Sequence, residues 1–230
     1  EPFGLSGVMG GMAAILSLAL VVVMVLVRST DISTRNSKLE VKDNLRGSAR
    51  LQIWLWLGYL GACTAGLTVL GHAAAMVRSS GGSEGESLNA VILIGLTTGL
   101  GGVLAGWLND SYGYKRLLIL LPGLTACVLI LIVLMGGKLV IPGLAIAGAL
   151  YGATITVVPT AISLLFGIGG SAVIYGRVMT AWGLAALCGP IIGGLGYDFT
   201  GGYTTTLLFS ASVALIAVLS GQRVSSWQSA

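Results

Sequence analysis

The sequence predicts an all-α, multi-pass membrane helix bundle, and three observations predict this fold class. Hydrophobic residues make up 55% of the 230 residues and charged residues only 9%, whereas a soluble domain carries about 25% charged residues. Glycine occurs 36 times, which is typical of membrane helices that pack closely. Charge-free apolar runs recur along the whole chain, and those of about 20 residues are long enough to cross a bilayer.

Seven membrane helices are expected from these runs. Six runs have the length of one span each: 2–27, 51–77, 87–109, 117–137, 178–197 and 199–222. The run 139–176 is too long for one span and too short for two, so we expect a helix over 141–166 followed by a glycine-rich loop, GIGGSAVIYG. The runs are apolar on every face, which excludes amphipathic helices lying on the membrane surface.

Lysine and arginine are distributed unequally between the two sides of this bundle. One side carries Arg28, Arg35, Lys38, Lys42, Arg46, Arg50, Lys115, Arg116, Arg177 and Arg223. The other side carries only Arg78 and Lys138. Because loops rich in lysine and arginine stay in the cytoplasm, we expect the N-terminus of this chain outside and its C-terminus in the cytoplasm. The membrane expected from this orientation is the plasma (cell inner) membrane.

The turn between the third and fourth expected spans concentrates charge between two apolar runs. It reads G-x-x-x-D-x-x-G-x-K-R, with Gly106, Asp110, Gly113, Lys115 and Arg116 at the fixed positions. Gly106 allows two helices to approach closely, and Gly113 permits a tight turn. Asp110 can accept hydrogen bonds from a helix N-terminus. The two cations can lie at the lipid headgroups and pair with this carboxylate.

This turn resembles the cytoplasmic signature of the major facilitator superfamily, except that Ser111 stands where a basic residue is usual. The resemblance implies a six-helix C-terminal half bundle over 51–222. The span 1–27 then corresponds to helix six of the family, 28–50 to the basic cytoplasmic central loop, and 223–230 to a cytoplasmic tail. It also implies an N-terminal half that this chain lacks, and a gating role for the charged turn at the cytoplasmic face.

Three further stretches narrow the resemblance. LGYLGACTAGLTVLGHAAAM, YGRVMTAWGLAALCGPIIGG and YDFTGGY are similar to the oxalate/formate antiporter and monocarboxylate-transporter-like branch. Oxalate carriers of that branch have an arginine eight residues before the motif aspartate and a lysine in helix eleven, where this chain has Gly102 and Trp182. A divalent anion without a charged partner is costly at the membrane midplane. We therefore expect a monocarboxylate or a less charged solute instead of oxalate.

Five residues in the spans are candidates for binding the solute or a proton. Trp182 takes the position of the helix-eleven lysine that lies in the cavity of oxalate carriers. Three other residues can orient a solute in a mostly apolar pocket: Tyr59, Tyr151 and Thr180. His72 is the titratable candidate for proton coupling. Each has an alternative role in helix packing or in an interhelical hydrogen bond, and His72 lies close enough to a helix end to bond simply to a neighbour.

Proline and glycine mark two expected irregularities in the helices. Gly189, Pro190, Gly193 and Gly194 form a G-P-x-x-G-G sequence, which resembles an antiporter motif of the symmetry-related helix five. Proline removes one helix hydrogen bond, and glycines allow bending and close contact. Pro159 is expected to kink its own helix for the same reason.

Motifs for enzyme chemistry are missing from the sequence. It has no Walker loop and no Cys/His cluster, and its three cysteines lie inside apolar runs, as packing residues do. We expect no enzymatic activity, cofactor, metal or nucleic-acid partner.

The expected partners are the lipid bilayer, a small-molecule solute and the N-terminal half. The resemblance implies a secondary active transporter, antiporter or symporter, that moves a small organic anion by alternating access. The alternative is a non-transporting membrane receptor, scaffold or sensor derived from a transporter half.

Overall fold

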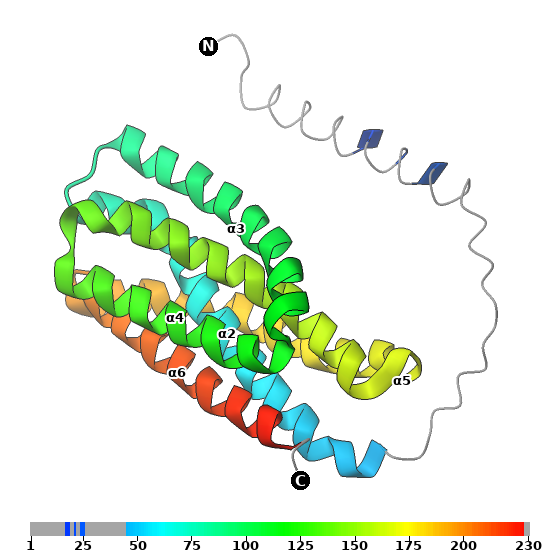
Figure 1. The fold of residues 1–230 in the computed structure, drawn as a ribbon. Coiled ribbons are helices and arrows are strands. Elements are labelled where there is room, and N and C mark those ends of the chain that lie inside the picture. The colour runs from blue at the N-terminus through cyan, green and yellow to red at the C-terminus, as the bar shows by residue number, and fades with distance from the viewer. Residues whose placement is uncertain (1–16, 19–20, 22–23, 26–44, 228–230) are drawn as a thin grey trace. The chain divides into compact units, whose positions relative to one another are not determined.

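The computed structural model describes residues 17–18, 21, 24–25 and 45–227. Residues 45–227 form the helices α2 (Leu45–Ser79), α3 (Glu84–Tyr112), α4 (Tyr114–Met135), α5 (Val140–Thr200) and α6 (Thr204–Ser226), with a short 3-10 helix, η1 (Gly137–Leu139) (Figure 1). Most of the expected span 2–27 and of the loop 28–50 lies outside the described residues. The helix expected over 2–27 therefore stays a prediction.

Helix α5 contains two membrane-length segments, because Gly167 interrupts it with a φ of 70° and a ψ of 166°. The first segment is Val140–Gly167 and the second is Ser171–Thr200. Together with the other four helices they make six segments, within the described part of the chain, that are long and apolar enough to cross a membrane. The predicted multi-pass helical bundle is therefore confirmed, with six of its helices described.

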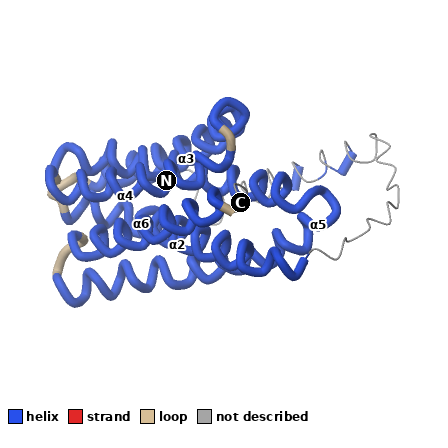
Figure 2. Tube along the Cα trace, turned by 60° about the horizontal axis from the view of Figure 1, so that its bottom comes forward, coloured by secondary structure: helices blue, strands red, loops and turns tan. Residues whose placement is uncertain are grey.

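Contacts between the helices establish their directions. In α2, Trp56 bonds to Thr180 of the second segment of α5. Further along both helices, Thr68 bonds to Gly189. The two helices are therefore parallel. The remaining helices alternate in direction, because each connection between them is only a few residues long. The resulting bundle has α4 and α6 side by side along one side, as Figures 1 and 2 both show.

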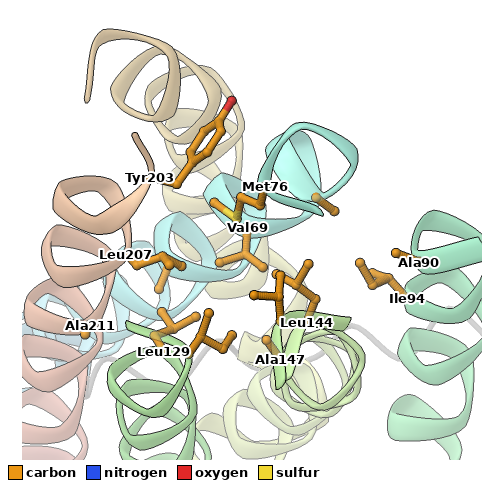
Figure 3. Packing of buried hydrophobic residues seen from close by; sticks show 14 of the residues in the cluster. Val69, Met76, Ala90, Ile94, Leu129, Leu144, Ala147, Tyr203, Leu207 and Ala211 are labelled. Atoms are coloured by element: carbon orange, nitrogen blue, oxygen red, sulfur yellow. The ribbon is translucent and has the colours of Figure 1, made fainter. Parts of the chain in front are cut away.

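The bundle core is built from small and branched apolar side chains. One cluster gathers Val69 of α2, Leu129 of α4, Leu144 of α5 and Leu207 of α6, all almost fully buried (Figure 3). A second cluster packs α2 against both segments of α5, and Tyr59 and Tyr151 belong to it. With Ala90 and Ile94 of α3 also in the first cluster, the core joins five helices at one end of the bundle and encloses two candidate site residues at the other.

The helices differ in how much of their surface this core encloses. In α2 and in the first segment of α5, 56% of the most apolar window is buried, against 17% in α3 and 28% in the second segment of α5. Helix α3 nevertheless approaches α5 closely: a Cβ atom on Gly152 would overlap the carbonyl oxygen of Thr98. Most of the surface of α3 and of the second segment of α5 is therefore free to contact lipid or another protein part.

Several expected boundaries differ from the observed ones. Helix α2 begins at Leu45 instead of Leu51. The expected loop over 167–176 is wrong for residues 171–176, because Gly167 alone makes the turn and the helix resumes by Ser171. The border between the last two spans lies at 201–203, where Gly201 ends α5 with a φ of 70°, and not at Asp198. Helix α6 then continues to Ser226 instead of ending at Gln222.

The two prolines expected to disturb the helices do not interrupt them. Pro159 and Pro190 both lie inside α5, and the non-helical dihedral angles of this helix are at Gly167. Proline fixes φ near −65°, which is a helical value, so it costs a hydrogen bond without forcing the backbone out of the helix. Glycine provides the break because its left-handed φ is strained for any residue with a side chain.

Candidate functional site

Two side-chain hydrogen bonds donated by aromatic residues join α2 to the second segment of α5. The indole nitrogen of Trp56 donates a hydrogen bond to the Thr180 hydroxyl at 2.9 Å, and the Tyr59 hydroxyl donates to the Met179 sulfur at 3.7 Å. Thr180 in turn donates to the backbone carbonyl of Arg177 at 2.7 Å. Tyr59 is buried, while Thr180 is exposed. These bonds therefore link the two helices both in the core, at Tyr59, and at the surface, at Thr180.

The third contact joins the two segments of α5 to each other. The indole nitrogen of Trp182 donates to the hydroxyl of Tyr151 at 2.9 Å. The Tyr151 ring lies against Gly66 of α2, where a Cβ atom would come within 3.0 Å of the ring carbon Cγ. Tyr151 is 7% exposed and Trp182 37% exposed, so this pair runs from the core to the surface.

These residues form one group, which we call the aromatic group: Trp56, Tyr59, Tyr151, Met179, Thr180 and Trp182. It contains four of the five candidates for solute or proton binding that the sequence singled out. Trp56 and Met179 were missed, because their partners lie 124 and 120 residues away and no local pattern marks them. The group combines hydroxyl and indole groups with apolar side chains, which is the composition of a pocket for a small solute.

His72, the fifth candidate, lies elsewhere on α2. It follows Tyr59 by 13 positions, which corresponds to about 20 Å along a helix. Its Nδ1 lies 3.1 Å from the carbonyl oxygen of Thr68. A carbonyl only accepts, so this contact is a hydrogen bond that Nδ1 donates. The ring lies 5.7 Å from that of Tyr203, and a Cβ atom on Gly193 would overlap it.

The glycine–proline sequence forms the surface of α5 that packs against α2 and α6. Gly189 accepts a hydrogen bond from the Thr68 hydroxyl at 3.1 Å, and the Gly193 carbonyl accepts one from Thr206 of α6 at 3.4 Å. The ring of Pro190 faces Gly71, where a Cβ atom would be 3.6 Å away. Gly194 lies at the edge of this contact, with its Cβ position 4.0 Å from Nε2 of His72. These glycines therefore serve close helix packing.

The charged turn lies where α3 meets α4. Gly113 has a φ of 75° and ends α3 directly before α4 begins. Asp110 is exposed, and among the described residues it forms no ion pair with Lys115 or Arg116. A Cβ atom on Gly106 would meet nothing within 4 Å. The close helix contact expected at this glycine is therefore not made by any helix of this bundle.

Gly102, at the position where oxalate carriers have an arginine, lies in a close contact between helices. Gly102 lies on α3 beside the first segment of α5, where a Cβ atom would be 3.2 Å from the Thr156 hydroxyl oxygen. Position 102 thus lies between two closely packed helices. Within residues 45–227 the structure brings no three histidine, cysteine, aspartate or glutamate side chains together that could hold a metal ion.

Comparison with known protein families identifies the fold. A model of the Major Facilitator Superfamily matches residues 72–224, which is 153 of the 230 residues. No curated protein matches the chain. The matched range begins in α2 and includes the charged turn and all of the following helices. The chain therefore belongs to the major facilitator superfamily, a family of membrane transporters.

Proposed function

We propose that the chain is the C-terminal half of a secondary active transporter that moves a small organic anion, such as a monocarboxylate. An N-terminal half would bind the other side of the solute, and rocking of the two halves would alternate access. The observation that carries the proposal is the aromatic group. It lies where α2 and both segments of α5 meet, and its outer members Thr180 and Trp182 reach the surface.

The hydrogen bonds of the aromatic group favour a single negative charge on the solute. The Tyr151 hydroxyl accepts from Trp182, and its own hydrogen has no acceptor among the described residues. The Tyr59 hydroxyl is committed only to sulfur, a weak acceptor. Two neutral donors can therefore bind a carboxylate, whereas a dicarboxylate such as oxalate would need a cation that the group does not contain.

The remaining candidate residues have roles at the two ends of the bundle. Arg50, Lys115, Arg116 and Arg223 lie at one end, which we assign to the cytoplasm. Asp110, exposed and without an ion pair there, is available to a helix N-terminus of the other half as a gate. His72 lies near the opposite end, and we propose it for proton coupling because it is the single histidine of the sequence.

The test is uptake by proteoliposomes that contain this chain together with its N-terminal half. Radiolabelled monocarboxylates, such as lactate, should enter with saturable kinetics, while oxalate should show no appreciable exchange. Liposomes with this chain alone are the control and should remain inactive. Saturable oxalate uptake at a rate comparable with lactate would contradict the proposed substrate class. Failure of the paired halves to transport any solute of a monocarboxylate panel would favour the receptor or scaffold alternative.

A further inference from the structure

A cleft of about 380 Å³ opens between the beginning of α2 and the second segment of α5. It lies outside the hydrogen bonds of Tyr59, Tyr151 and Trp182 described above, and shares only Trp56 with the aromatic group. Its walls include Gln52, Ile53, Trp56, Leu57, Arg177 and Val178. Most of these side chains are apolar, and a single guanidinium provides the charge. The cleft therefore has the composition of a site for a molecule that is part anion and part hydrocarbon.

Arg177 supplies the polar end of the cleft. Its side chain is exposed, and its Nη1 donates to the Gln52 side-chain oxygen at a long 3.4 Å. The other N–H groups of this guanidinium have no acceptor within residues 45–227. A guanidinium presents donors in a fixed fork that matches the oxygens of a phosphate. The pairing with Gln52 therefore orients Arg177 and leaves most of its donors for a ligand.

The depth of the cleft fits the headgroup region of the bilayer. The apolar span of α2 begins at Ala49, and the hydrogen bond that Arg177 donates to Gln52 holds its guanidinium close to that level. Arg50, also exposed, directly follows the cleft residue Ala49 on α2. Arginine and tryptophan are the residues expected at the membrane–water interface. Ile53 and Leu57, further along α2, and the buried Val178 provide apolar walls of the cleft.

We propose that this cleft binds one anionic phospholipid of the leaflet on the side of Arg50 and Arg177. The headgroup phosphate would be held by Arg177, with Arg50 nearby, and an acyl chain would lie against Ile53, Leu57 and Val178. Charge complementarity and the order of polar and apolar walls from the membrane surface inward favour a lipid over a soluble anion. This site is independent of the identity of the transported solute.

The test is native mass spectrometry of the purified chain in detergent, titrated with phosphatidylglycerol or phosphatidylcholine. The wild-type chain should retain one phosphatidylglycerol. Arg177→Gln should weaken this binding roughly five- to tenfold. Arg223→Gln is the matched control, because Arg223 is also exposed and lies at the same end of the bundle, on α6 and outside the cleft. It should leave the binding unchanged.

Measurements on the wild-type chain test the proposal without relying on the variants. Phosphatidylcholine should not displace the bound phosphatidylglycerol, and neither inorganic phosphate nor glycerol phosphate should compete at millimolar concentration. Displacement by either soluble phosphate would identify the cleft as a site for a free anion and overturn the lipid assignment. Equal retention of phosphatidylcholine, or an equal loss of binding in Arg177→Gln and Arg223→Gln, would show only unspecific adsorption and would also overturn it.

Discussion

The hydrogen bond from Trp182 to Tyr151 joins the two segments of α5 across the break at Gly167. Because the Tyr151 ring also rests on Gly66, the same residue connects α2 with both segments. A movement of the second segment relative to the first would have to break or carry along this bond. The aromatic group is therefore placed where a change in helix arrangement would alter its own hydrogen bonds and, with them, the proposed solute site.

The first prediction concerns the indole donor of Trp182. Trp182→Phe keeps an aromatic ring but removes the hydrogen bond to Tyr151, which is worth about 0.5–1.5 kcal/mol. In the paired halves, the KM for the transported monocarboxylate should rise about two- to tenfold, with a smaller change in maximal rate. Trp107→Phe is the control, because Trp107 of α3 is 65% exposed and lies outside the aromatic group. Equal kinetics of the two variants would remove Trp182 from the proposed site.

The second prediction concerns the contact between His72 and Gly193. A methyl group on Gly193 would overlap the His72 ring, so Gly193→Ala should lower stability in detergent by about 1–3 kcal/mol, as overpacking does. Gly183→Ala is the matched control on the same segment, because a Cβ atom there meets nothing within 4 Å. It should be neutral or slightly stabilising.

A double variant separates packing from other effects of Gly193→Ala. His72→Ala removes the ring that the new methyl group would strike, so Gly193→Ala should cost much less in this background. Thermal unfolding of the four proteins gives the coupling between the two positions. A coupling near zero would mean that the destabilisation arises at another contact of Gly193, such as the bond from Thr206.

The helices themselves could be predicted from the sequence because hydropathy depends on composition over about 20 residues. Their ends could not, since these depend on single backbone conformations. Ten residues of the sequence GIGGSAVIYG suggest a loop, yet one left-handed glycine, Gly167, makes the turn. Asp198 suggests a span boundary, but the last turn of α5 tolerates an exposed carboxylate. The position of a charged residue was thus a poor guide to the residue at which a span ends.

The candidate site could be predicted only in part, for a related reason. Tyr59, Tyr151, Thr180 and Trp182 stand out as polar or aromatic residues within apolar runs. Their partners are set by how α2 packs on α5, at sequence separations above 100 for Trp56 and Met179. Pairing over such distances leaves no trace in local spacing. His72 was chosen because its side chain is titratable, which says nothing about where it lies. In the structure it is about 20 Å from Tyr59 along α2.

The third prediction tests the orientation in the membrane. Ser83 caps α3, accepting from the Glu86 backbone at 3.2 Å, so a cysteine there would disturb the helix. Gly85 is a better probe, since a Cβ atom there meets nothing within 4 Å. In a chain whose native cysteines are replaced, Gly85→Cys should react with an impermeant thiol reagent only from outside. Ser111→Cys, at the other end of α3, should react only from the cytoplasm. Reversed labelling would invert the proposed topology.

The proposed gating role of Asp110 depends on a partner outside this bundle. Its carboxylate is exposed at the end of α3 and, among the described residues, is not paired with Lys115 or Arg116. Gly106, one turn earlier, faces open space. Both features fit a surface that another helix covers in one conformation of the complete transporter, with the carboxylate at that helix's N-terminus.

The fourth prediction follows from this arrangement. Asp110→Asn keeps the shape of the side chain but removes its charge, which weakens a charge–dipole contact by about 0.3–2 kcal/mol. Such an energy shifts a nearly balanced conformational equilibrium several-fold, so transport by the paired halves should slow while membrane insertion stays unchanged. The thermal stability of this chain alone should hardly change, because no contact within residues 45–227 is lost. Asp198→Asn, exposed at the opposite end of the bundle, is the control. Wild-type transport by Asp110→Asn would show that Asp110 is an ordinary turn residue without a part in gating.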